Sequence, residues 1–189
     1  MRYRRITAAI YDILIFMFIF IIISSFVPIS KNAAELSNQL NNYTNNFLNL
    51  SQAEQNQMIE TAYLLDRETS YVYMIWSLLL IGYFVFIPKW LDGKTLGQYF
   101  RKVKLVSETD EKVTLNQYII RALLNSGLFL TILAPLFIYI CDAIWYSNVT
   151  SILCLIQFIY WIVSFVVLII KKKTIHDYVT NTKIIEVKR

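Results

Sequence analysis

Four long apolar runs without a charged residue constrain this chain more than any other feature of its sequence. They cover residues 13–30, 69–88, 122–141 and 143–170. Each is long enough to cross the roughly 30 Å of hydrocarbon in a bilayer. At 57% hydrophobic residues, the chain is also too apolar for an ordinary soluble domain of its size. We therefore expect residues 1–189 to form a single all-α membrane domain with four transmembrane helices, for which the lipid bilayer is the first partner.

The positive charges are distributed unevenly over the segments that flank these runs. Three of the 18 Lys and Arg residues lie at the amino end, seven between the second and third runs and six in the tail, which leaves only Lys31 and Arg67 elsewhere. Because cytoplasmic segments carry the excess of Lys and Arg, both termini should be cytoplasmic. This topology accounts for the net charge of +5 without a nucleic-acid partner. We expect a multi-pass protein of the cell membrane, and the composition suggests a bacterial plasma membrane.

The polar insert at residues 31–70 is expected to form an amphipathic helical hairpin outside the membrane. Apolar residues at alternating spacings of four and three predict helices at 33–50 and 52–68. Two capping boxes are expected, each with a polar residue followed three positions later by a glutamate: Asn32 with Glu35, and Ser51 with Glu54. The simpler interpretation of the hairpin is a cap that packs on itself. The alternative is a surface that binds another membrane protein.

Two further segments, the loop at 92–117 and the tail at 171–189, are expected in the cytoplasm. Apolar residues alternate with polar ones at 103–105 and again at 113–115, which predicts a small β-hairpin-like segment across the polar turn between them. The same alternation near 185–187 predicts a third strand, because a lone hairpin is only marginally stable.

Asp12 stands inside the otherwise apolar first span. A charged residue there costs roughly 2.5 to 3.5 kcal/mol on insertion scales, so it needs a partner, a water-filled cavity or a functional role. Arg5 lies seven residues earlier on the same helical stripe, and Arg121 enters the membrane from the same side. Both are candidate partners of Asp12. Asn125 follows one turn after Arg121, and Pro135 is expected to kink this third span.

Several common kinds of active site do not fit the sequence. The only histidine is His176, so the chain alone can build neither a His-rich metal site nor a convincing Ser-His-Asp hydrolase. The triplet from Gly93 to Thr95 is similar to the end of a phosphate-binding loop, but Pro88 stands where the first glycine is required. A glycine turn at the membrane surface is the simpler interpretation. We therefore expect no enzyme activity, no metal and no cofactor.

Four motifs follow one another in a recognisable order. They are R-I-x-A-A-x-x-D at 5–12, D-G-K-T-L-G-Q at 92–98 with V-K-L-V at 103–106, Arg121, and I-H-D-Y-V-T-N-T-K-I-I at 175–185. This order resembles the RDD family of membrane proteins, which is named for one arginine and two aspartates. The resemblance implies that these residues are Arg5, Asp12 and Asp177. Asn181 departs from the pattern, because the tail motif usually has glycine there.

The resemblance implies a small helical membrane domain for which transport of ions or small solutes is the usual suggestion. The candidate transport or structural site contains Arg5, Asp12, Gly93, Thr95, Gly97, Arg121, Asn125, His176 and Asp177. For Asp177 we expect a solvated structural role, in which it caps the turn of the tail or pairs with the lysines at 171–173.

Two functions remain open on the sequence. In the first, the protein exchanges a cation for a proton at Asp12, because burial and a nearby arginine shift the affinity of a carboxylate for protons in opposite directions. In the second, the Arg and Asp residues form a fixed polar staple in a scaffold that does not transport. The partner is then a second copy of the chain or another membrane protein.

Overall fold

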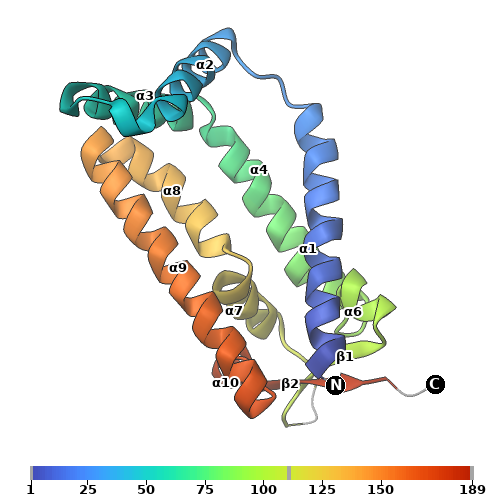
Figure 1. The fold of residues 1–189 in the computed structure, drawn as a ribbon. Helices are drawn as coiled ribbons and strands as arrows, with labels where there is room; N and C mark the ends of the chain where they lie inside the picture. Colours follow the sequence, from blue (N-terminus) through green and yellow to red (C-terminus); the bar gives the residue numbers. More distant parts are fainter. Residues whose placement is uncertain (1, 110–111, 188–189) are drawn as a thin grey trace.

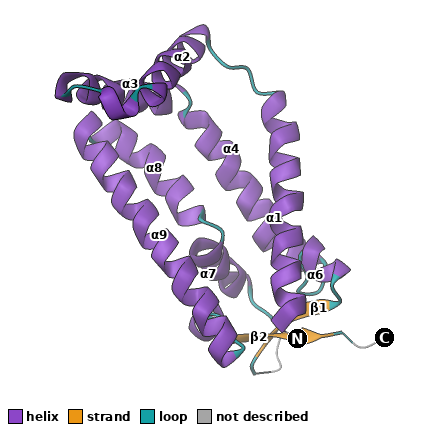
Figure 2. Cartoon of the chain, in the orientation of Figure 1, coloured by secondary structure: helices purple, strands orange, loops and turns teal. Residues whose placement is uncertain are grey.

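The computed structural model describes residues 2–109 and 112–187, in which long helices run between a helical cap and a small sheet (Figures 1 and 2). The long helices are α1 (Arg2–Ser25), α4 (Ser70–Ile81), α7 (Leu115–Asn125), α8 (Leu128–Ile140) and α9 (Ala143–Lys171). Figure 1 shows both chain termini at one end of the bundle, which we call the terminal end. The cap covers the opposite end, which we call the insert end.

Among the described residues, three helical segments are long and apolar enough to cross a membrane, and a fourth if α7 and α8 form one broken span. The three are Tyr3–Ser25, Ser70–Trp90 and Ala143–Lys171. In the second of these, α4 continues through a π-helical turn, η2 (Gly82–Phe86), into α5 (Ile87–Trp90). The mostly helical, membrane-type fold expected from the apolar runs is confirmed.

The bend in the remaining apolar run lies at Gly127. The axes of α7 and α8 differ by 70°, and Gly127 between them has a φ of +75°. A left-handed residue cannot continue a right-handed helix, so the chain turns there. Pro135, the residue expected to kink this run, stays inside α8.

The insert folds as the expected helical hairpin. α2 (Lys31–Asn45) and α3 (Gln52–Glu68) pack against each other across a short 3₁₀ turn, η1 (Phe47–Asn49). The capping box that begins α3 at Ser51 is confirmed, but α2 begins two residues earlier than expected. Its N-cap is Ser30, whose side chain accepts from the N–H of Ala33, and not Asn32. The hairpin covers the ends of α8 and α9 (Figure 1).

The predicted β-hairpin is wrong, whereas the predicted strand in the tail is present and pairs with the first strand of that hairpin. β1 (Val103–Ser107) pairs in antiparallel register with β2 (Thr182–Glu186), with Leu105 opposite Ile184. Residues 113 and 114 form no strand, because Thr114 caps α7. The turn expected between the hairpin strands includes residues 110 and 111, which lie outside the described residues. The apolar face of β1, Val103 and Leu105, joins the buried core beneath α1 and α4.

Candidate functional site

A glycine turn at the terminal end precedes the short helix α6 (Leu96–Phe100). Gly93 has a φ of +82°, and a Cβ there would lie 2.3 Å from the backbone oxygen of Leu105, so no other residue fits. Two residues later Thr95 caps α6, with its Oγ1 accepting from the N–H of Gln98. The cap leaves the hydroxyl proton of Thr95 free to donate elsewhere.

That proton goes to Asp12, which is buried where α1 packs on α6. The carboxylate of Asp12 accepts three hydrogen bonds, from the hydroxyl of Thr95 at 2.6 Å, the hydroxyl of Tyr83 at 2.7 Å and the backbone N–H of Gly97 at 2.8 Å. Gly97 allows this approach, because a Cβ there would lie 2.3 Å from the backbone oxygen of Ala8. Three donors satisfy the buried carboxylate without a cation.

Both arginines pair with Asp177. Nη2 of Arg5 donates to its Oδ2, and Nη1 of Arg121 donates to its Oδ1 at 2.6 Å. The expectation that Arg5 or Arg121 would pair with Asp12 is therefore wrong. The physical reason is that the tail brings a second carboxylate between the two guanidinium groups, and this short contact replaces a reach of two helical turns along α1.

Asp177 is fully buried in α10 (Ile175–Val179), so the expected solvated role is also wrong. It does cap the turn of the tail, since its Oδ2 accepts from the N–H of Thr174 at 2.9 Å. Burial alone would raise the pKa of Asp177, but the charges of Arg121 and Arg5 hold that pKa well below its usual range. The carboxylate is therefore ionised at neutral pH.

The two arginines also donate to neighbouring segments. Nη1 of Arg5 donates to the backbone oxygen of Lys172 at the end of α9, at 2.7 Å. Nη1 of Arg121 donates to Oγ1 of Thr182 in β2, also at 2.7 Å. We call Arg5, Arg121 and Asp177 the charged cluster. It connects α1 and α7 to the consecutive elements α9, α10 and β2 near the other end of the chain.

His176 lies beside the charged cluster and is buried as a neutral ring. Its Nδ1 is 3.3 Å from the hydroxyl of Tyr160, and its Nε2 is 4.0 Å from Oδ1 of Asp177. Burial first, and then the charge of Arg121, lower the pKa of His176 to about 3. The cluster therefore has two positive charges and one negative charge at neutral pH.

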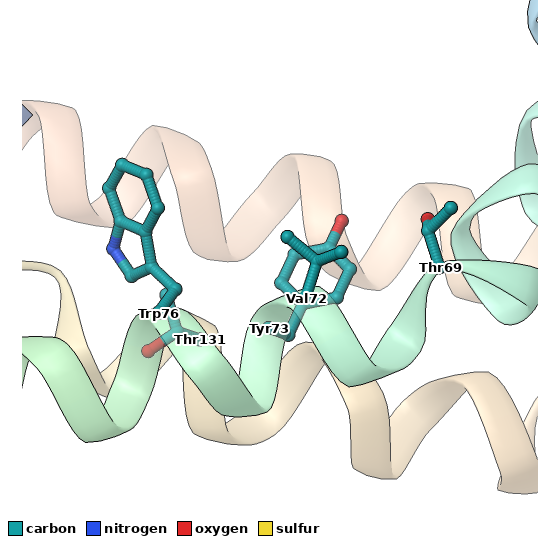
Figure 3. Close-up of a pocket in the computed structure, with 5 residues that line it drawn as sticks. All are labelled: Thr69, Val72, Tyr73, Trp76 and Thr131. Carbon is teal, nitrogen blue, oxygen red and sulfur yellow. The ribbon is translucent and has the colours of Figure 1, made fainter. Parts of the chain in front are cut away.

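Two pockets lie along the inside of α4. The smaller, of about 450 Å³, is lined by Thr69, Val72, Tyr73 and Trp76 of this span together with Thr131 of α8 (Figure 3). The larger, of about 650 Å³, extends from Trp76 towards the terminal end and is lined by parts of α1, α4, α7 and α9. Trp76 lines both pockets.

The larger pocket gathers most of the candidate residues. Those that line it are Arg5, Asp12, Gly93, Thr95, Arg121, Asn125 and His176. Gly97 and Asp177 are bonded to residues of this set: Gly97 donates to Asp12, and Asp177 pairs with Arg5 and Arg121. The sequence reasoning missed Tyr83, Trp76 and Thr174, and only Thr174 carried a local signal, because it directly precedes the I-H-D motif. Across residues 2–109 and 112–187, no three His, Cys, Asp or Glu side chains are arranged to hold a metal ion.

A comparison with protein-family models gives one match that extends over nearly all of the chain. The model of the RDD family aligns with residues 2–181. The chain belongs to the RDD family. Searches among curated proteins and among solved structures each returned no match.

Asp12 and Asp177, the two aspartates that the resemblance singled out, lie in different surroundings. In this RDD protein Arg5 pairs with Asp177, whereas Asp12 binds neutral donors on a different set of elements. Asn181, where the resemblance led us to expect glycine, has a φ of +49°. Asparagine is among the few residues other than glycine that adopt this left-handed conformation readily, so the turn is retained.

Proposed function

We propose that this RDD protein transports a small solute across the membrane, along a route formed by the two pockets. The observation that carries the proposal is that their linings follow one span in succession, from Thr69 to Trp76 and from Trp76 to Pro88. Nineteen steps of helical rise correspond to about 28 Å, close to the thickness of the hydrocarbon layer. Unrelated packing defects would not be expected to follow one another along one span over this length.

Trp76 is the plug in this proposal. Its ring contacts two aromatic rings of α1, with centroid distances of 5.3 Å to Phe16 and 4.1 Å to Phe20. Aromatic contacts of this kind hold the ring in place without a covalent or ionic bond, so a rotamer change of Trp76 can join the two pockets. The π-helical turn at 82–86 lies in the same span, and such turns are common at functional sites.

Asp12 has a positioning role in this proposal. Cation and proton exchange at Asp12, the mechanism expected from the sequence, would require the carboxylate to give up donors from Thr95, Tyr83 and Gly97. We instead assign Asp12 to holding α6 against α1, which keeps the larger pocket open. The proposal assigns the protein no chemical reaction.

A scaffold that binds another protein is the second candidate function. It is favoured by the tip of the insert, where Leu48 is 94% exposed and Phe47 is 54% exposed. Exposed apolar side chains on a polar hairpin are typical of a contact surface, although two residues form only a small patch. In this alternative the charged cluster and Asp12 are structural.

The test is leakage through liposomes that contain purified protein. Trp76→Ala removes the plug, so release of trapped carboxyfluorescein and dissipation of a proton gradient should both rise about tenfold or more over wild type, a change of about 1.4 kcal/mol in the barrier. The matched control is Trp145→Ala, because Trp145 is exposed and lines neither pocket. Folded Trp76→Ala protein that is as tight as the control would overturn the proposal and favour the scaffold.

A further inference from the structure

We propose that the larger pocket binds a membrane lipid with one negative charge, with its head group at Arg121 and Thr174 and its acyl chain between α1 and α9. The inference rests on the proposed function for the route, since it names the class of solute that would use it. Binding itself can be measured without transport.

An unpartnered hydroxyl marks the polar end of the pocket. Thr174 is only 8% exposed, and its Oγ1 lies at the N-cap of α10 facing the N–H of Asp177, while its hydroxyl proton has no acceptor among the described residues. The same residue lines the larger pocket. A buried hydroxyl normally has a partner, because burial removes its bonds to water. An oxygen of a bound head group would supply the missing acceptor.

Arg121 provides unused donors in the same place. Within the described part of the chain it donates only through Nη1, to Asp177 and Thr182. A guanidinium carries five N–H groups in a planar fork, so Nε and Nη2 still have donors to offer. Such forks bind phosphate and carboxylate oxygens through two parallel hydrogen bonds. Arg121 lines the pocket, and its side chain keeps 12% of its exposure.

The charges at this end favour an anion. Arg5 and Arg121 carry two positive charges, Asp177 carries one negative charge, and buried His176 is neutral, which leaves one positive charge without a counterion. The other charged group lining the pocket is Asp12. Its three neutral donors do not cancel its negative charge. It lies seven residues from Arg5, about 10 Å along α1, so it balances the cluster less closely than a charge placed at Arg121 would. A single negative charge on the ligand would balance the cluster.

The other end of the pocket is apolar and open at its side. Ile13 of α1 and Phe165 of α9 both line the pocket and are 59% and 51% exposed. In Figure 1 these two helices stand apart, α1 with α4 and α6, and α9 with α8 and α10, as their packing contacts also indicate. Apolar side chains exposed at mid-span face lipid, so an acyl chain can enter from the bilayer while its head group stays near Arg121.

The test uses brominated lipids, which quench nearby tryptophans. A variant that keeps only Trp76, with the other three tryptophans changed to phenylalanine, reports on the pocket. The matched variant keeps only Trp90, which is 77% exposed and lines neither pocket, and reports on the surrounding bilayer. Both are placed in phosphatidylcholine vesicles with increasing amounts of brominated phosphatidylglycerol, or of brominated phosphatidylcholine.

We expect the anionic lipid to quench Trp76 with an affinity about tenfold higher than the zwitterionic one, beyond any preference seen at Trp90. Thr174→Val should reduce this preference several-fold; because Oγ1 also lies at the N-cap of α10, the preference is measured on variant protein that remains folded. Equal preference at both tryptophans, or a preference for the zwitterionic lipid, would overturn the inference. So would a folded Thr174→Val protein with unchanged preference. If the lipid preference is present but folded Trp76→Ala protein leaks no more than Trp145→Ala, the route alone is rejected and the lipid site stands.

Discussion

Asp12 and Asp177 are both buried aspartates of the RDD motif set, yet they are stabilised in opposite ways. Asp12 is held by two hydroxyl groups and one backbone N–H, all neutral. Asp177 is held by two arginines and the N–H of Thr174. Each neutral donor makes its own hydrogen bond to the carboxylate, so the loss of one donor leaves the other hydrogen bonds in place. An ion pair is different, because removal of the carboxylate leaves buried positive charges without a partner.

The two aspartates also connect different parts of the chain. Asp12 holds α1 against the short helix α6 and the π-helical turn η2, through Thr95, Gly97 and Tyr83. Asp177 connects the amino end to the carboxyl end through Arg5, and to α7 through Arg121. The comparison predicts that the charged cluster determines whether the terminal end assembles, whereas the Asp12 contacts determine how α6 is positioned on an assembled bundle.

The largest expected effect is that of Asp177→Asn. The substitution keeps the size of the side chain but leaves Arg5 and Arg121 buried without a counterion, so the free energy of unfolding should fall by about 3–5 kcal/mol. Unfolding in detergent by heat or denaturant measures this. The control is Glu186→Gln, which weakens the exposed pair with Arg4 and should cost less than about 1 kcal/mol. Equal costs for both variants would contradict the assigned role of the cluster.

Gly97→Ala tests the Asp12 side of the comparison by steric means. The new methyl group would approach the backbone oxygen of Ala8 and the carboxylate of Asp12, so α6 must move away from α1 at a cost of about 3 kcal/mol. Gly82→Ala is the control, because nothing lies within 4 Å of that position and the helix should tolerate or gain from alanine. A Gly97→Ala protein as stable as the control would show that the close approach is not required.

Asp12→Asn should have a smaller effect than either. The amide keeps the shape and one acceptor oxygen, but one of the three donors loses its partner, which costs about 2 kcal/mol. Tyr83→Phe removes a single donor and should cost about half as much. Liposome flux measured on both variants separates the roles. If Asp12→Asn abolishes flux while its stability equals that of wild type, Asp12 carries the transported ion and does not have the positioning role assigned to it.

The smallest effect is a pH dependence next to the charged cluster. The folded-state pKa of His176, about 3, lies below its ordinary value near 6.5, so the unfolded chain binds the proton first as the pH falls. The contribution of His176 to stability is complete above pH 6.5 and is lost below it, by about 1.4 kcal/mol per pH unit. Unfolding at pH 7.5, 6.5 and 5.5 should show this slope, and His176→Gln should remove it. A slope that survives the substitution would assign it to another group.

The elements that could be predicted are those encoded by neighbouring residues. Ser51 and Glu54 lie three positions apart and bond only to each other and the local backbone, so their pattern sufficed to place the start of α3. The apolar run of the second span likewise predicted its bounds to within two residues, since length and composition decide whether a helix can cross the bilayer.

The elements that were mispredicted depend on distant parts of the chain. The alternation at 103–105 indicates a strand but does not choose its partner: the structure pairs this strand with the predicted tail strand and forms none at 113–115. The partner of Arg5 was sought along its own helix, although Asp177 is 172 positions away. At the third run, proline gave the stronger local signal for a kink. The glycine bend at 127 depends on how α7 and α8 pack, which sequence spacing does not reveal.

The pairing of the two chain ends has a consequence for biosynthesis. α1 is translated long before α10 and β2. The pair of Arg5 with Asp177 and the pairing of β1 with β2 therefore cannot form until these later segments have left the ribosome. Contacts of such long sequence separation form late in folding. A chain that stops short of the tail can insert every apolar helix and still lack the charged cluster. Formation of the charged cluster therefore depends on α10 and β2 and reports that every apolar helix before them has been made.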